Sequence, residues 1–254
     1  MSRTYVVTGV ASGIGRATAE LLRSRGEHVI GVDLRDADLI ADLSSKDGLA
    51  SMVDGATDLS GGAIDGVLAI AGVLGSDAPL ITRVNYFGAI GTLSGLRPLL
   101  ARSAAPRAAA ISSMASLLDV DQPLLDALTA EDEAAAIARA EQVATPDETD
   151  HRTYATTKRA LAKWIRRSSV TDDWAGAGIP LNAIAPGVVR TPMSDSAIDE
   201  IVTRVPMPLV GPADPVVCAR LLAWLTSEEN THVTGQVIFQ DGGSDAVIRG
   251  DSTW

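Results

Sequence analysis

Short apolar segments alternate with segments of helical spacing along most of the chain. Most of the apolar segments are continuously apolar, as parallel strands buried on both faces are. They occupy residues 4–8, 28–33, 39–42, 65–71, 107–112, 180–185 and 236–240. Helical spacing marks residues 14–25, 46–56, 79–103, 152–169 and 215–227. This alternation predicts an α/β fold: a Rossmann-like, doubly wound parallel sheet of about seven strands in a single domain, residues 1–254, with right-handed crossovers.

Two segments interrupt the alternation. Residues 117–150 are rich in Ala, Glu and Asp, have helical spacing and carry turn signals near both ends. They predict one or two extra helices inserted before the helix at 152–169. Residues 191–213 contain an amphipathic stretch flanked by prolines. We expect this second segment to form a loop over the substrate.

Composition narrows the class of protein. The chain has 254 residues, 46% of them hydrophobic, and a formal net charge of −11. This acidic balance argues against nucleic acid or an anionic membrane surface as a partner. No apolar segment is long enough to span a membrane, and the N-terminus runs directly into a predicted strand. We therefore expect a cytoplasmic protein.

Cysteine and histidine give no sign of a metal site or a disulfide. The single cysteine, Cys218, lies among apolar residues and is expected to be a buried structural thiol. The three histidines, His28, His151 and His232, lack the spacing of metal ligands. No metal is therefore expected.

A glycine-rich segment follows the first predicted strand. Residues 8–15 read TGVASGIG, with glycines at Gly9, Gly13 and Gly15, and open directly into a predicted helix. Glycines at such a turn let the backbone approach a pyrophosphate, which then meets the helix N-terminus. The spacing differs from the commoner G-x-G-x-x-G, and a glycine-rich loop alone is weak evidence. Its place between the first strand and the first helix favours a nucleotide site.

The end of the second predicted strand indicates which dinucleotide is bound. Asp33 lies there, 18 residues beyond Gly15. An acidic side chain at this point can bind the ribose hydroxyls of NAD and repels the 2′-phosphate of NADP. Ser12 stands where a basic residue would help to hold that phosphate, and Arg35 is the one ambiguous feature. NAD is therefore favoured over NADP.

Tyr154 and Lys158 lie four residues apart in YATTK, within the helix predicted at 152–169. Residues at this spacing share one helix face, a turn apart. Such pairs are common on exposed helices, so the pair alone is more often surface decoration than a catalytic acid with a neighbouring cation.

The motifs taken together resemble the short-chain dehydrogenase/reductase family over almost the whole chain. Their order, and their placement at the ends of predicted strands, are the specific part of the resemblance. They are TGVASGIG at 8–15, Asp33, Asp42-Leu43, Ala71-Gly72, Asn85 in VNYFG, Ser113 in ISSMAS, Tyr154, Lys158 and PGVVRT at 186–191.

The resemblance implies four catalytic roles. Tyr154 would be the general acid–base, and Lys158 would lower the pKa of its phenol and hold the nicotinamide ribose. Ser113 would hydrogen-bond the substrate oxygen, and Asn85 would support a water-linked proton path behind Lys158. Ser112 competes with Ser113, but alternation along the strand points the two to opposite faces, and family position favours Ser113.

The resemblance also implies a set of residues that bind NAD(H). Asp42 and Leu43 would lie beside the adenine, and Pro186, Val189 and Thr191 would hold the nicotinamide end. The complete set is Gly9, Ser12, Gly13, Ile14, Gly15, Asp33, Asp42, Leu43, Ala71, Gly72, Tyr154, Lys158, Pro186, Val189 and Thr191.

Two departures from the usual family pattern narrow the relatives. Ala69-Ile70-Ala71-Gly72 replaces the common Asn-Asn-Ala-Gly, which puts a hydrogen bond within the sheet in doubt. In addition, 40 residues separate Ser113 from Tyr154, where most members have far fewer. Together with the ending DGGSDAVIRG, this insertion resembles the bacterial 3α-hydroxysteroid dehydrogenase/carbonyl reductase subgroup. Coniferyl alcohol dehydrogenase-like enzymes share the pattern.

The insertion and the later loop bear on the substrate and on assembly. Their apolar residues either line a hydrophobic pocket or pack the added helices onto the core, and packing is the more frequent outcome. An insertion directly before residues 152–169 could block one of the family's oligomer surfaces, so a homodimer is expected rather than a homotetramer. The apolar residues that either line the pocket or pack the added helices are Leu117, Leu118, Leu124, Leu125, Leu128, Met193, Ile198, Val202, Val205 and Met207.

These observations predict an NAD(H)-linked enzyme that interconverts a bulky apolar alcohol and its ketone or aldehyde. A hydroxysteroid or a cyclic or aromatic alcohol would fit, and a coniferyl or aryl alcohol dehydrogenase is the alternative. A non-catalytic NAD(H)-binding regulator is the alternative from another class. A sugar-nucleotide epimerase is disfavoured because no added C-terminal domain is present. An enoyl reductase is disfavoured because such enzymes space tyrosine and lysine more widely.

Overall fold

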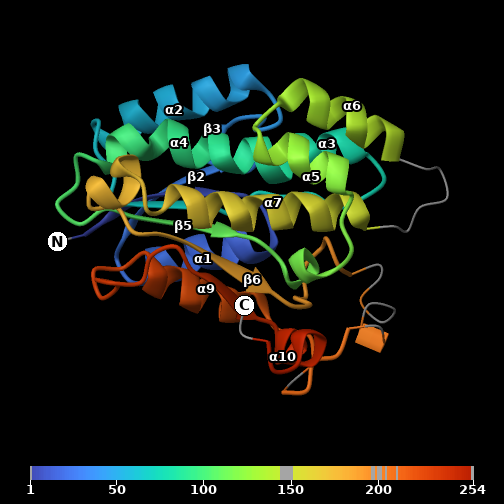
Figure 1. Cartoon of the computed structure of the whole chain (residues 1–254). Coiled ribbons are helices and arrows are strands. Elements are labelled where there is room, and N and C mark those ends of the chain that lie inside the picture. The colour runs from blue at the N-terminus through green and yellow to red at the C-terminus, as the bar shows by residue number, and fades with distance from the viewer. Residues whose placement is uncertain are drawn as a thin grey trace.

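A seven-stranded parallel sheet forms the centre of the protein (Figure 1). The computed structural model describes residues 2–143, 151–195, 198, 202–203, 205–209 and 211–252. The strands lie in the order β3-β2-β1-β4-β5-β6-β7, so the direction of winding reverses between β1 and β4. The strands are β1 (Thr4–Thr8), β2 (His28–Asp33), β3 (Leu39–Ile40), β4 (Gly66–Ala69), β5 (Arg107–Ile111), β6 (Leu181–Pro186) and β7 (Val237–Gln240). The predicted doubly wound sheet is confirmed.

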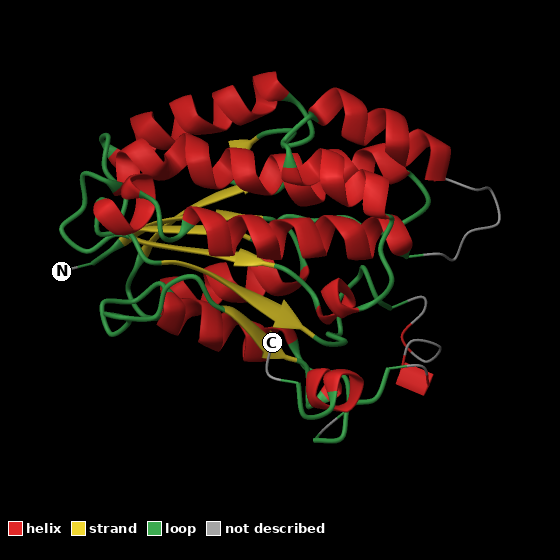
Figure 2. Cartoon of the chain, in the orientation of Figure 1, coloured by secondary structure: helices red, strands yellow, loops and turns green. Residues whose placement is uncertain are grey.

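Helices cover both faces of this sheet (Figure 2). On one side lie α2 (Lys46–Ser60), α4 (Ala89–Leu100) and α7 (Arg152–Ser168), and on the other lie α1 (Gly13–Ser24) and α9 (Pro215–Leu225). Two buried apolar clusters fill the two interfaces. Two short elements lie near the edge of the fold: α10 (Ser244–Arg249) and a π-helical turn, η3 (Asp172–Gly176).

Two sequence predictions were wrong in detail. The strand expected at 39–42 ends at Ile40, because only Leu39 and Ile40 pair with β2 before the chain turns toward α2. The long helix expected at 79–103 is α3 (Ala78–Thr82), a π-helical turn η1 (Arg83–Gly88) and α4. The wider turn contains Asn85, whose side-chain amide exchanges hydrogen bonds with the backbone of Val73.

The insertion before α7 forms two helices, α5 (Gln122–Thr129) and α6 (Glu133–Val143), after a 3₁₀ turn η2 (Met114–Leu117). α5 packs on α7, and α6 packs on α5 and α3. Leu124, Leu125 and Leu128 of α5 are buried in the core, so packing rather than pocket lining is their role. Residues 144–150 of the predicted insertion lie outside the described residues.

Asp121 joins both inserted helices to the helix that carries Tyr154. Its carboxylate caps α5 at Leu124 N (2.8 Å) and accepts two hydrogen bonds from Arg139 of α6 (2.9 and 2.7 Å). Its backbone N–H donates to the hydroxyl of Thr156 in α7 at 3.0 Å. The hydrogen bonds from Arg139 are the main reason that the pKa of Asp121 lies below its usual value.

We expect Asp121→Ala to lower the free energy of unfolding by about 2–4 kcal/mol, because it removes a helix cap and a charge-assisted pair. Asp77→Ala is the matched control, since Asp77 caps α3 at Leu80 N (2.9 Å) on the surface and its loss should cost about 1 kcal/mol. Urea unfolding measures both. The pKa of Asp121 is lowered by folding, so its contribution is present above the unfolded pKa of about 3.9 and is lost as the pH falls below it. Equal losses in the two variants at neutral pH would contradict this role.

The described residues carry no group of His, Cys, Asp and Glu side chains that could hold a metal ion. Within the same part of the chain, no helix has the length and apolar character needed to cross a membrane. Cys218 is buried, as predicted, and burial raises the pKa of its thiol to about 12.

Candidate active site

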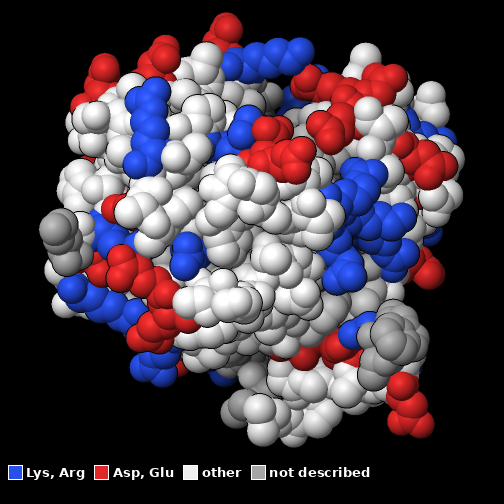
Figure 3. All heavy atoms as spheres, turned by 60° about the vertical axis from the view of Figure 1, so that its left-hand side comes forward, with Lys and Arg blue, Asp and Glu red and all other residues white. Residues whose placement is uncertain are grey.

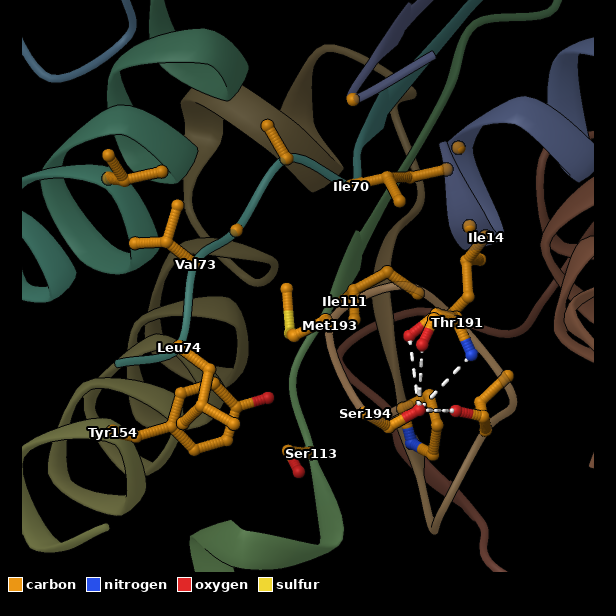
Figure 4. A pocket seen from close by; sticks show the side chains of 18 of the residues that line it. Ile14, Ile70, Val73, Leu74, Ile111, Ser113, Tyr154, Thr191, Met193 and Ser194 are labelled. Carbon is orange, nitrogen blue, oxygen red and sulfur yellow. Dashed lines mark hydrogen bonds between the residues drawn. The ribbon is translucent and has the colours of Figure 1, made fainter. Parts of the chain in front are cut away.

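A cavity of about 430 Å³ opens at the carboxyl ends of the strands, where the sheet order reverses. In open α/β sheets this is the position where ligands bind. Of the residues predicted to act in catalysis or to bind the cofactor, every one except Asn85 lines this cavity. Segments far apart in the sequence therefore meet at one site, and part of it is drawn in Figure 4.

The glycine-rich turn is built by very close backbone packing. Gly9 has a φ of +78° and Gly13 a φ of +53°, a region that disfavours residues with a side chain. A Cβ at Gly15 would lie 2.1 Å from the carbonyl oxygen of Gly9, and a Cβ at Gly13 would lie 3.2 Å from Thr191. The turn therefore brings the N-terminus of α1 against the cavity with bare backbone, as a pyrophosphate site requires.

Asp33 fixes the first part of the same turn. Its carboxylate accepts hydrogen bonds from the backbone N–H groups of Ala11 (2.9 Å) and Leu34 (2.7 Å). Asp33 thus stands at the end of β2 with its charge toward the cavity wall, where ribose hydroxyls would meet it. Asp42 lines the cavity nearby, and its hydrogen bonds from Ser44 hold its pKa below the usual value.

Asn85 lies behind the cavity wall. It is completely buried, and its amide is held by the N–H and C=O of Val73, both at 2.8 Å. A Cβ at Gly72 would lie 3.2 Å from the Asn85 side-chain oxygen and 3.6 Å from the Lys158 ammonium. Asn85, Gly72 and Lys158 are therefore neighbours, and both polar atoms of the Asn85 side chain already have partners.

Tyr154 and Lys158 lie on one face of α7 and both line the cavity. The Lys158 nitrogen is 5.6 Å from the centre of the Tyr154 ring and donates to the carbonyl of Ile111 at 3.0 Å. Ser113 is close enough for its side chain to interact with the phenol of Tyr154 and lower its pKa. Ser112 instead donates to the backbone carbonyl of Lys158 at 3.0 Å. This geometry favours Ser113 over Ser112 for the substrate oxygen.

Burial governs the pKa values of this pair. Burial raises the pKa of Tyr154, only partly offset by Ser113, and Lys158 is not among the groups that lower it. Burial also lowers the pKa of Lys158 to about 8. Both shifts have the same cause, because removal from water disfavours the charged form of either group. That Lys158 lowers the pKa of Tyr154 stays a prediction from the family resemblance.

The loop after β6 closes the other end of the cavity. Pro186, Val189 and Thr191 line it, and Ser194 ties the loop together by donating to the carbonyl of Val189 at 2.6 Å and accepting from the N–H of Thr191 at 3.1 Å. The dashed lines in Figure 4 mark this network. Ser194 was not predicted from the sequence, although its place in TPMS three residues after Thr191 fits a short side-chain-to-backbone turn.

Beyond Ser113 and Tyr154 the cavity wall becomes apolar. Of the residues that the sequence offered as pocket lining, Leu118, Met193 and Val205 line the cavity, whereas Leu117, Ile198, Val202 and Met207 do not. Figure 4 shows Val73, Leu74 and Met193 near Tyr154 and Ser113. The lining residues that the sequence analysis missed here are Val73, Leu74, Leu80, Val84, Met114, Ala115 and His151.

These features define a dinucleotide-linked oxidoreductase site. The glycine turn offers bare backbone to the cavity, and Tyr154 and Lys158 of α7 line the same cavity at the carboxyl ends of the doubly wound sheet. Residues 9–245 match the family described as "Enoyl-(Acyl carrier protein) reductase". The chain is 35% identical to the 3-alpha-hydroxysteroid dehydrogenase/carbonyl reductase of Comamonas testosteroni, over 96% of this chain and 97% of that protein. It is 31% identical to the coniferyl-alcohol dehydrogenase of a Pseudomonas species, over 95% and 96% of the two chains.

A solved structure agrees with these sequence matches. The 3-alpha-hydroxysteroid dehydrogenase from Pseudomonas sp. B-0831, complexed with NADH, superposes with a TM-score of 0.91 at 37% identity, and the match covers 98% of this chain and 99% of that one. The chain belongs to the short-chain dehydrogenase/reductase family, and the bacterial 3α-hydroxysteroid dehydrogenase/carbonyl reductase resemblance is confirmed.

Proposed function

We propose that the protein is an NAD(H)-dependent dehydrogenase/carbonyl reductase that interconverts a secondary or primary alcohol and its ketone or aldehyde, on a bulky apolar substrate such as a hydroxysteroid or a cyclic or aromatic alcohol. The observation that carries this proposal is the single cavity shared by the glycine turn, Asp33, Ser113, Tyr154 and Lys158. The relatives with hydroxysteroid and coniferyl alcohol in their names support the substrate class.

The residues present fit NAD(H). The bare backbone at Gly9, Gly13 and Gly15 leaves room for a pyrophosphate, and Asp33 at the end of β2 suits unphosphorylated ribose hydroxyls. The neighbour complexed with NADH supports the identity of the cofactor, and Pro186, Val189 and Thr191, which line the cavity, would hold its nicotinamide end. When bound, the cofactor supplies or accepts the hydride.

The protein's own residues would bind the substrate oxygen and move its proton. The hydroxyl of Ser113 would hold this oxygen beside the phenol of Tyr154. Tyr154 would give its proton to a carbonyl oxygen in reduction or take one from an alcohol in oxidation. Lys158 beside the phenol would restrain the ribose and stabilise a phenolate when one forms.

Apolar residues set the substrate class. Val73, Leu74, Met114, Leu118 and Met193 line the cavity beyond the catalytic pair and favour an alcohol with a hydrophobic body. Acidic and basic side chains are interspersed among uncharged areas on the face in Figure 3, and with a net charge of −11 we include neither nucleic acid nor a membrane among the partners.

Enoyl reduction is disfavoured despite the description of the matching family. That chemistry uses a wider spacing of tyrosine and lysine than the four residues from Tyr154 to Lys158. A non-catalytic NAD(H)-binding regulator is the alternative from another class. The shared lining of the cavity by Ser113, Tyr154 and Lys158 argues against it, because a regulator needs no acid–base group beside the cofactor.

Initial rates with steroid, monocyclic and cinnamyl-type alcohols and NAD test the proposal. We expect absorbance of NADH to appear with at least one apolar class, with kcat/KM for NAD at least about tenfold above that for NADP, because Asp33 repels a 2′-phosphate. Turnover of small polar alcohols that lack any ring, and of no other alcohol, would contradict the apolar pocket. Tight NADH binding without turnover of any alcohol would support the regulator instead.

Assembly and location remain proposals. We propose a homodimer, since α5 and α6 pack over α3 and α7 and would cover a surface that family members use for assembly. Light scattering tests this, and a monodisperse tetramer would count against it. The cytoplasmic location expected from the sequence also remains a proposal.

A further inference from the structure

We propose that His151 determines specificity by binding a second oxygen function, best a carboxylate, on the substrate. The inference rests on the proposed function, and it concerns the same cavity. His151 lines this cavity and directly precedes α7, three residues before Tyr154.

The walls around the reacting position offer few polar groups. Ser113 and Tyr154 are assigned to the reacting oxygen, and Ser112 is used by the backbone of Lys158. The neighbouring described lining residues carry apolar side chains: Val73, Leu74, Leu80, Val84, Met114, Ala115, Leu118, Met193 and Val205. Thr191 and Ser194 bond within the loop after β6, so among the described residues His151 is the polar side chain beside these apolar walls that remains for a ligand.

The imidazole of His151 has no structural task among the described residues. The backbone carbonyl of His151 accepts a hydrogen bond from Ala155 N at 2.8 Å, which fixes the residue at the start of α7. Its side chain does not cap the helix and makes no hydrogen bond within the described part of the chain. It is exposed at the cavity, so one ring nitrogen can donate to a ligand and the other can accept.

His151 and Tyr154 reach the cavity from the same end of α7. His151 directly precedes the helix, and Tyr154 is its third residue. A substrate that places its carbinol carbon at Tyr154 and Ser113 would then present a second oxygen function, elsewhere on its body, to His151.

The imidazole of His151 favours a substrate that carries an oxygen function within its reach. An imidazole N–H donates well to a carboxylate, and charge-assisted hydrogen bonds of this kind are stronger than neutral ones. A methyl group in the same place leaves the imidazole without that partner. The apolar walls hold the ring in either case, so His151 should act on the preference between matched substrates rather than on the acid–base chemistry.

The test compares kcat/KM for oxidation of cis-4-hydroxycyclohexanecarboxylate and cis-4-methylcyclohexanol by NAD. In His151→Phe the carboxylate-to-methyl ratio of kcat/KM should fall at least about tenfold, and in His151→Gln, which keeps a donor, it should stay within about threefold of the wild-type ratio. His28→Phe is the matched control, because His28 is exposed at the amino end of β2, opposite the cavity. Its ratio should equal that of the wild type.

An unchanged ratio in His151→Phe, or an equal fall in His28→Phe, would overturn the inference while the proposed function stands. If the wild-type protein oxidises neither ring alcohol nor any other apolar alcohol with NAD, the proposed function fails and this inference fails with it. A rise in KM for the carboxylate in His151→Phe at unchanged kcat, with recovery in His151→Gln, supports binding by the imidazole.

Discussion

Tyr154→Phe is expected to lower kcat by about 10²–10⁴-fold for both oxidation and reduction, because it removes the proton donor and acceptor beside the substrate oxygen. The affinity for NADH should change by less than about threefold, since the aromatic ring and its packing remain. Steady-state rates at 340 nm measure the first quantity, and quenching or enhancement of NADH fluorescence measures the second.

Tyr86→Phe is the matched control for this experiment. Tyr86 is fully buried next to Asn85 but does not line the cavity, and its hydroxyl interacts with Arg167 rather than with the site. Removing that hydroxyl should leave kcat within about twofold, because it does not touch the reacting groups. Substantial turnover in Tyr154→Phe, or an equal loss in Tyr86→Phe, would show that Tyr154 is not the acid–base group.

Gly15→Ala is expected to weaken NADH binding by at least about tenfold and to lower the thermal midpoint by several degrees. Its Cβ would lie 2.1 Å from the carbonyl oxygen of Gly9 and 3.0 Å from that of Thr8. Backbone cannot move aside as a flexible side chain can, so the turn must shift, and overpacking of this kind costs about 1–3 kcal/mol. In a chain of this length each kcal/mol lowers the midpoint by about 2–4 °C.

Gly211→Ala is the matched control for Gly15→Ala. Gly211 has an ordinary φ, and nothing lies within 4 Å of a Cβ built on it. Its replacement should leave NADH affinity and the thermal midpoint unchanged. If NADH binds Gly15→Ala as tightly as it binds the wild type, then the turn after β1 does not hold the cofactor.

The sequence predicted those parts of the fold that local pattern alone determines. The strands at 4–8 and 28–33 have the predicted bounds, since turns or glycines delimit each apolar run. The glycine turn between the first strand and the first helix was predicted because glycines before a helix have few other uses, whereas its place at the switch of strand order is seen only in the structure. The π-helical turn at Asn85 was not predicted, because it depends on hydrogen bonds to Val73, which precedes it by 12 residues.

The parts of the site that depend on tertiary burial could not be predicted. Spacing placed Lys158 beside Tyr154, but the pKa of the phenol is raised rather than lowered, since desolvation is a property of the folded surroundings. The leucines of 117–128 have similar helical spacing, yet Leu118 lines the cavity while Leu124 is buried. His151 carried no recognisable signal, because a histidine before a helix is unremarkable until the cavity beside it is known.

A crystal structure of the protein with NADH and an unreactive ketone analogue tests the central claim most directly. The account predicts the nicotinamide between Thr191 and Lys158, with the ketone oxygen within hydrogen-bonding distance of both the Tyr154 phenol and the Ser113 hydroxyl. A nicotinamide bound elsewhere, or a ketone oxygen beyond the reach of the Tyr154 phenol, would contradict it.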